Sequence, residues 1–158
     1  MDTSQRQTVE NLLKYCLLNF QIRGGSRIIS SFIYQVLREL DIDAPAVEGI
    51  IYVEIKGHPR PFAHCFNVSS CDIIDGTVYG FALLNKAVAD LFPLYIIGNP
   101  PDHMEYCVTK ELKPASQFQF RKEYLEKVIS ELDLYHNASV ERFSDISDSR
   151  KQDLFYLL

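Results

Sequence analysis

Apolar and polar residues alternate with a helical period near the N-terminus of the chain. Residues 4–20 carry apolar side chains three or four positions apart, and the pattern resumes after the break QIRGG and continues to Asp41. This spacing places apolar side chains on one face of a helix. We therefore expect two amphipathic helices, the second ending before Pro45, because proline disfavours a helical residue before it.

The pattern changes at Ala46. The segment AVEGIIYVEIK is rich in β-branched residues and predicts a strand, KGHPRP predicts a turn, and PFAHCFNVS predicts a second strand that returns antiparallel to the first. SSCD predicts another turn, and DIIDGTVYG a short third strand. Two helices followed by an antiparallel meander indicate an α+β fold, with the N-terminal helices packed on an antiparallel sheet.

The second half of the chain gives weaker signals. Residues 83–92 predict a short helix, residues 94–97 a strand, GNPPDH a loop and EYCVTKEL a further strand. Residues 114–134 predict a late helix, whose aromatic stripe we interpret as core. The apolar end DLFYLL is expected to dock back on the domain as a final helical turn.

Size and charge narrow the class of protein. A chain of 158 residues with 47% hydrophobic residues is expected to form one domain, residues 1–158, with a core of its own. A net charge of −5, without a cluster of Lys or Arg, argues against a nucleic-acid partner. No apolar stretch approaches the ~18–20 residues of a membrane span. The polar N-terminus does not resemble a secretory signal, so we expect a cytoplasmic protein, with delivery as a secreted effector left open.

The cysteines show no metal-binding pattern. Cys16, Cys65, Cys71 and Cys107 include no C-x-x-C pair, so neither a zinc site nor any other metal site is expected. We expect free thiols of a reducing compartment. Cys16 and Cys107 are predicted core residues, Cys71 lies in a predicted turn, and Cys65 should be buried on the strand face opposite that of its neighbour His64.

Three residues could carry chemistry together. Ser26 opens the second predicted helix, His64 lies within the second predicted strand, and Asp75 lies on the third. Taken singly, they suit a helix N-cap, a core histidine and a turn. On adjacent antiparallel strands, however, Asp75 could fix the tautomer of His64. The helix N-terminus could then bring residue 26 to the other imidazole nitrogen, in a position that lowers the pKa of a thiol.

The order of these segments resembles the transglutaminase-like superfamily of papain-like Cys-His-Asp enzymes. GGSRIISSFIYQVLREL, with its Leu37-Arg38 pair, resembles the family's nucleophile-bearing helix, and DIDAPAVEG its following turn and strand. AHCFNV resembles the histidine strand and IIDGT the aspartate strand. The resemblance covers residues 24–77, followed by a helical C-terminal part at about residues 114–158. It implies a papain-like fold in which residue 26 attacks a carbonyl, His64 is the base and acid, and Asp75 orients His64.

The chain departs from the family pattern at two places. Ser26 stands where the family has its nucleophilic cysteine, and Cys65-Phe66 stands where tryptophan often follows the histidine. A hydroxyl is far less acidic than a thiol. Two explanations stay open: a Cys-to-Ser form of a thiol enzyme, which the retained His64 and Asp75 favour, or a natural serine in an inactive or reworked site.

The resemblance implies a peptide or protein substrate and no cofactor. The same acyl chemistry serves a cysteine protease or other hydrolase, an amidase or deamidase, and an acyltransferase such as a transglutaminase. PFAH also resembles the corresponding strand of leader-peptide proteases. The alternatives are an inactive module of the same fold that binds a peptide or protein partner, and a purely structural domain. The sequence does not indicate an oligomeric state.

Some side chains near this pattern have weaker claims to a role. The backbone N–H of Ser26 is the best candidate to stabilise an oxyanion, and Gln21, five residues earlier, is a weaker one by analogy with papain-like enzymes. His58 and His103 lie in predicted loops. From its loop, His103 could reach a substrate cleft.

Overall fold

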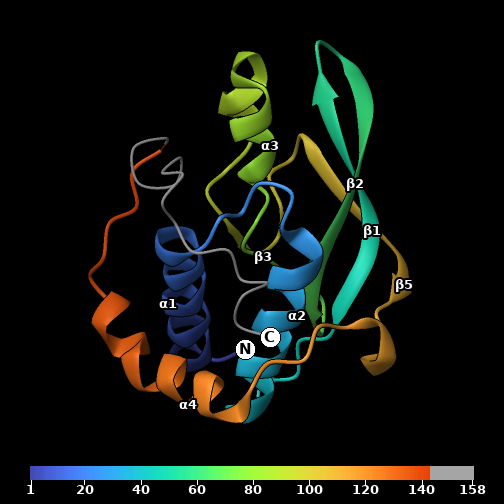
Figure 1. Cartoon of the computed structure of the whole chain (residues 1–158). Helices are drawn as coiled ribbons and strands as arrows, with labels where there is room; N and C mark the ends of the chain where they lie inside the picture. The colour runs from blue at the N-terminus through green and yellow to red at the C-terminus, as the bar shows by residue number, and fades with distance from the viewer. Residues whose placement is uncertain (143–158) are drawn as a thin grey trace.

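The structure is a computed structural model in which residues 1–142 are described (Figure 1). The predicted docking of DLFYLL therefore lies outside the described residues. The elements follow in the order α1 (Thr3–Asn19), α2 (Ser26–Glu39), β1 (Ala46–Ile55), β2 (His58–Ser69), β3 (Asp72–Asp75), α3 (Gly80–Leu84), the 3-10 turn η1 (Lys86–Leu91), β4 (Ile96–Gly98), β5 (Met104–Glu111), η2 (Pro114–Ser116), α4 (Lys122–Glu131) and η3 (Leu132–Tyr135).

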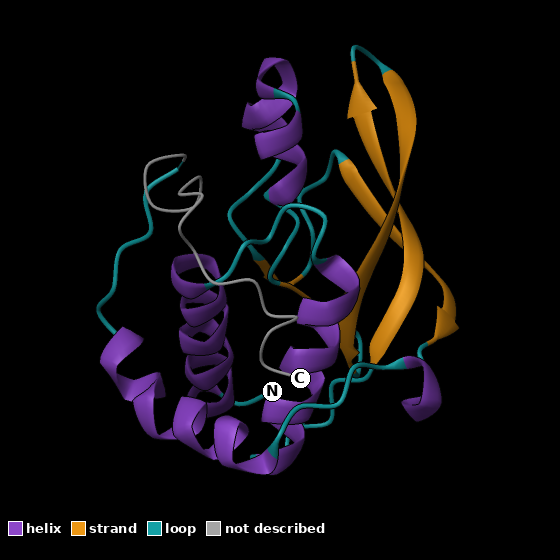
Figure 2. Cartoon of the chain, viewed as in Figure 1, coloured by secondary structure: helices purple, strands orange, loops and turns teal. Residues whose placement is uncertain are grey.

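The predicted α+β class is confirmed. The five strands form one antiparallel sheet in the order β4-β3-β2-β1-β5, and the helices α1, α2 and α4 gather beside it (Figure 2). β1 and β2 pair along nearly their whole length, whereas β2 meets β3 only over its last three residues. Among residues 1–142, the β2 edge that precedes Asn67 therefore has no strand partner. No helix of this part of the chain is long and apolar enough to cross a bilayer.

The core lies where the apolar faces of α1 and α2 meet the sheet. Phe20 and Phe32 are fully buried, and their rings meet edge to face at 5.3 Å. Burying each such side chain contributes about 1.5–3 kcal/mol. The buried amide of Asn67 on β2 ties the layers together, because it donates to the carbonyl of Ser30 on α2 and to that of Ala44 before β1, each at 2.9 Å.

Hydrogen bonds limit two of the predicted elements. The third strand ends at Asp75 and does not run through DIIDGTVYG, because the Asp75 carboxylate turns the chain by accepting from the Thr77 N–H at 3.0 Å. The predicted helix over residues 114–134 is helical only from Lys122 onward, apart from η2. The buried Gln35 side chain of α2 holds the segment before α4 by bonding the Phe120 N–H at 3.0 Å.

The remaining differences are smaller. The helix predicted at residues 83–92 is divided into α3 and η1. The strand predicted at residues 94–97 is β4, which begins two residues later and ends one residue later. Cys16 is buried, as predicted. The prediction of Cys107 as a core residue is wrong, because β5 is an edge strand and leaves this thiol partly exposed.

Candidate functional site

His64 and Asp75 form a buried pair, which the predicted strand arrangement allows. Nε2 of His64 lies 2.9 Å from Oδ2 and 3.1 Å from Oδ1 of Asp75, and the two residues expose 7% and 1% of their surface. Because Nε2 faces the carboxylate, Nδ1 is the ring nitrogen that Asp75 leaves free for another partner. A carboxylate in this position selects the tautomer with its proton on Nε2 and leaves Nδ1 able to accept a proton.

Further donors hold the carboxylate in its ionised form. Burial alone would raise the pKa of Asp75, but the charge and hydrogen bond of His64, with those of Tyr106 and Thr77, outweigh burial and lower it. The Tyr106 hydroxyl donates to Oδ2 at 2.7 Å, and the Thr77 N–H donates to Oδ1 at 3.0 Å. Asp75 is therefore built to remain a carboxylate beside the imidazole.

Ser26 is the first residue of α2, and Gly25 before it is the N-cap, without a side-chain cap. The N-cap interpretation of Ser26 is therefore wrong. Its hydroxyl instead accepts the Cys65 N–H at 3.3 Å, on the edge of β2 that β3 does not cover. Within residues 1–142, no hydrogen bond joins Ser26 to His64.

Two hollows meet at Ser26 and His64. One, of about 110 Å³, has mainly apolar walls formed by α3 and the segment before α2. The other, of about 420 Å³, opens over β1, β2 and β5. Ser26, Ala63 and His64 line both hollows. We refer to these two hollows together as the cleft.

The two ends of the cleft differ in character. Ile22, Phe81 and Leu84 line the smaller hollow, and Leu84 is 64% exposed at its rim. Glu48 and Thr109 line the larger hollow. Glu48 pairs with Lys110 at 3.2 Å and with Arg27. These two cations lower the pKa of the Glu48 carboxyl group, and Lys110 has the larger effect. One end thus suits apolar groups, and the other presents a charged cluster.

Cys65 is buried beside the site, as expected from its place next to His64. It pairs with Glu48 of β1 and packs against Ala46 and Leu112. Burial raises the pKa of its thiol, which argues against a nucleophilic role.

Other predicted candidates lie outside the cleft. Gln21 is exposed and is not among the residues that line either hollow, so its predicted oxyanion role is not supported. His103 lines neither hollow, and its Nε2 lies 2.7 Å from the carbonyl oxygen of Leu91. His58 is exposed at the start of β2, and Cys71 is exposed in the turn before β3.

Sequence reasoning missed Tyr106 and Thr77 as partners of Asp75. Thr77 directly follows the matched segment's Asp75-Gly76 and could have been found from it. Tyr106 could not, because no local pattern links a residue of β5 to one of β3. Among residues 1–142, no group of three or more His, Cys, Asp or Glu side chains is placed to hold a metal ion.

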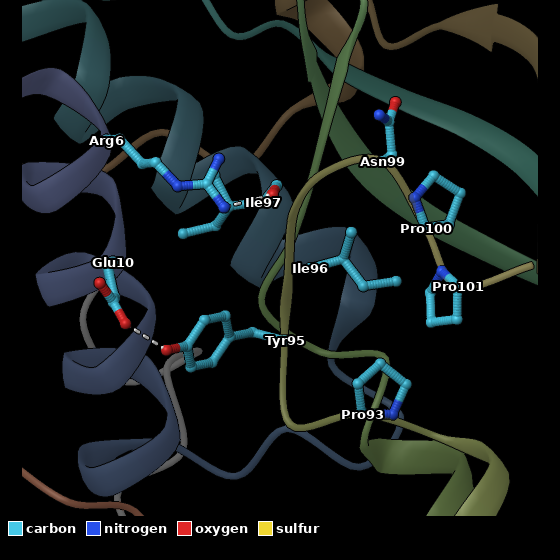
Figure 3. Close-up of a pocket in the computed structure, with 9 residues that line it drawn as sticks. All are labelled: Arg6, Glu10, Pro93, Tyr95, Ile96, Ile97, Asn99, Pro100 and Pro101. Carbon is cyan, nitrogen blue, oxygen red and sulfur yellow. Dashed lines mark hydrogen bonds between the residues drawn. The ribbon is translucent and has the colours of Figure 1, made fainter. Parts of the chain in front are cut away.

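A separate hollow of about 500 Å³ lies between α1 and the segment around β4 (Figure 3). Arg6 crosses it to donate to the carbonyl of Ile97 at 2.9 Å, and the Tyr95 hydroxyl donates to the Glu10 carboxylate. The pKa of Tyr95 is raised to about 12, mainly by burial and next by the Glu10 carboxylate. The hollow shares no residue with the cleft at Ser26.

Comparisons with known proteins add little to this geometry. No protein-family model matches the chain, and no curated protein matches it. Among solved structures, the crystal structure of a genomics target aligns over 97% of this chain and 83% of its own, with 15% identity and a TM-score of 0.46. This distant likeness assigns neither a family nor an activity, so the site rests on the residues of this chain.

Proposed function

We propose that the cleft is an acyl-transfer site of transglutaminase-like type, acting on an amide bond of a peptide or protein. In this site, position 26 carries the nucleophile, His64 is the general base and then the general acid, and Asp75 orients His64. The observation that carries the proposal is the buried His64–Asp75 pair. The pair engages Nε2 and not Nδ1 of His64, and His64 lines the cleft together with residue 26, at the N-terminus of α2.

The chemistry follows from these positions. The nucleophile at position 26 loses its proton to Nδ1 of His64 and bonds to the carbonyl carbon of the substrate. The C–N bond then breaks, and the leaving amine takes the proton from His64. Attack by water on the acyl-enzyme releases a carboxylic acid, and attack by an amine releases a new amide. Both routes restore the nucleophile with its proton.

The N-terminus of α2 favours this reaction electrostatically. The first amides of a helix have no acceptor within it, and the helix dipole places partial positive charge there. The Ser26 N–H is one of these amides, so it can donate to the oxyanion of a tetrahedral intermediate. The same field lowers the pKa of a thiol far more usefully than that of a hydroxyl. We therefore propose that the site is built for a thiol, and that Ser26 leaves the cleft complete with a weak nucleophile.

The test is trapping of an acyl-enzyme. The Ser26→Cys protein is incubated with an activated acyl donor, such as a phenyl thioester of an acetylated peptide, and examined by intact and peptide mass spectrometry. We expect one acyl group at position 26 and its loss in Ser26→Cys/His64→Ala. The matched control is Ser26→Cys/His58→Ala, which changes an exposed histidine outside the cleft. Acylation that is indifferent to His64 would refute the proposal.

A binding module is the second candidate, and one observation favours it. The Ser26 hydroxyl accepts the Cys65 N–H and makes no hydrogen bond to His64 within the described residues, so it is not poised for proton transfer. This candidate predicts that wild-type protein binds a peptide reversibly in the cleft, while Ser26→Cys forms no covalent adduct. Chemical-shift changes at Ala63 and Leu84, measured by NMR with and without peptide, would report such binding.

A further inference from the structure

The Tyr106 hydroxyl bonds to Asp75 from a strand that is not adjacent to the strand of Asp75. Tyr106 lies on β5 and Asp75 on β3, and the strand order places β2 and β1 between them. The hydroxyl nevertheless donates to Oδ2 of Asp75 at 2.7 Å. This hydrogen bond therefore joins two strands that are not neighbours in the sheet.

The position of Tyr106 is set by packing as well as by this hydrogen bond. Its ring meets that of Phe66 edge to face, with centroids 4.9 Å apart and planes at 88°. Phe66 in turn lies roughly parallel to His64, at 6.4 Å and 20°. Gly49 of β1 leaves the room for Phe66, because a Cβ there would come within 2.8 Å of the phenyl ring. Tyr106 is thus connected to His64 by two routes, through the Phe66 ring and through the Asp75 carboxylate.

The hydrogen bonds at Asp75 leave the carboxylate little freedom to rotate. Oδ2 receives the Tyr106 hydroxyl at 2.7 Å and faces Nε2 of His64 at 2.9 Å. Oδ1 receives the Thr77 N–H at 3.0 Å and faces the same Nε2 at 3.1 Å. Without Tyr106, Oδ2 would lose its shortest bond and keep only His64, while Oδ1 would keep Thr77 and His64.

We propose that Tyr106 is a positioning residue of this site, whose hydroxyl fixes the Asp75 carboxylate so that His64 keeps Nε2 bonded and Nδ1 directed to the cleft. A catalytic role for this positioning rests on the proposed function, but the effect of Tyr106 on Asp75 and His64 does not. The titratable groups that face Asp75 are His64 from β2 and Tyr106 from β5. The Cys65 thiol, on the other face of β2, adds a weaker charge interaction.

The experiment compares Tyr106→Phe with Tyr52→Phe by NMR. Tyr52 lies on β1 and serves as a matched loss of a hydroxyl from the same sheet. The Asp75 carboxyl is followed by its ¹³C shift against pH, and the His64 tautomer by its ¹⁵N shifts. Tyr106→Phe should raise the Asp75 midpoint by roughly one pH unit, because a donor to the charged form is lost. It should also raise the share of His64 with its proton on Nδ1. Tyr52→Phe should change neither.

An unchanged Asp75 midpoint and an unchanged tautomer in folded Tyr106→Phe would overturn the proposal. If that variant does not fold, protein made with 3-fluorotyrosine provides the second measurement. The fluorinated phenol is more acidic and donates more strongly, so the Asp75 midpoint should fall, and no change would likewise overturn the proposal. If the Asp75 midpoint changes as expected but Ser26→Cys is not acylated, Tyr106 keeps its positioning role and the proposed function is refuted.

Discussion

Replacing Gly49 by alanine should strain the sheet beside the candidate site. A Cβ at this position would lie 2.2 Å from the carbonyl oxygen of Cys107 and 2.8 Å from a ring carbon of Phe66. The oxygen belongs to the backbone of β5, which pairs with β1 here, so relief requires these two strands to move apart. Overpacking of this kind costs typically 1–3 kcal/mol, and a lost ladder hydrogen bond about 1 kcal/mol more. We expect Gly49→Ala to lower the free energy of unfolding by about 3 kcal/mol.

The assay is urea unfolding followed by circular dichroism, with Gly57→Ala as the control. Gly57 lies in the turn of the same β1–β2 hairpin, where nothing lies within 4 Å of a new Cβ but φ is +80°. Alanine there should cost only about 1–2 kcal/mol, from the left-handed backbone alone. Phe66 must also move in Gly49→Ala, so the His64 ring signals should shift more than in the control. A loss of stability for Gly49→Ala no greater than for Gly57→Ala would refute this account of the packing.

Two further changes test the supports of the site. The lowered pKa of Asp75 means that the folded state binds the proton of this carboxyl group more weakly than the unfolded state does. Asp75 therefore contributes stability at pH values above its unfolded pKa of about 4. That contribution is lost as the pH falls below this value. Asp75→Asn should therefore flatten the acid side of the stability profile, measured as urea midpoint against pH, and an equally steep acid side would contradict the assignment. Asn67→Ala should cost about 2–4 kcal/mol in urea unfolding, because it leaves the carbonyls of Ser30 and Ala44 without their donor in the core. Asn99→Ala, at an exposed position, should lower the free energy of unfolding by at most about 0.5 kcal/mol. Equal losses of stability for the two variants would contradict the role of Asn67.

The parts of the fold that could be predicted are those that rest on local patterns. The helical spacing before Asp41 and the β-branched run after Ala46 each depend on neighbours in sequence. The two helices and the strand that they predict lie close to the expected positions. The pairing of His64 with Asp75 followed from hairpin logic, since successive antiparallel strands place such residues together. These predictions needed no knowledge of distant contacts.

The remaining features depend on contacts that are distant in sequence. Ser26 is not the cap of its helix, because the unpartnered edge of β2 takes its hydroxyl. The helix expected from residue 114 begins at Lys122 because Gln35 binds the chain before it. Tyr106 bonds to Asp75 although two strands lie between β5 and β3 in the sheet. In each case a tertiary hydrogen bond outweighs or adds to the local preference, and no local pattern records it.

The most direct test of the site is the reactivity of a thiol at position 26. The Ser26→Cys protein is treated with iodoacetamide at pH 6, and the rates at position 26 and at the exposed Cys71 are measured by peptide mass spectrometry. A thiol activated by the helix N-terminus and His64 should react at least about tenfold faster than Cys71, and His64→Ala should remove the difference. Equal rates at the two positions, unaffected by His64→Ala, would contradict an activated nucleophile site.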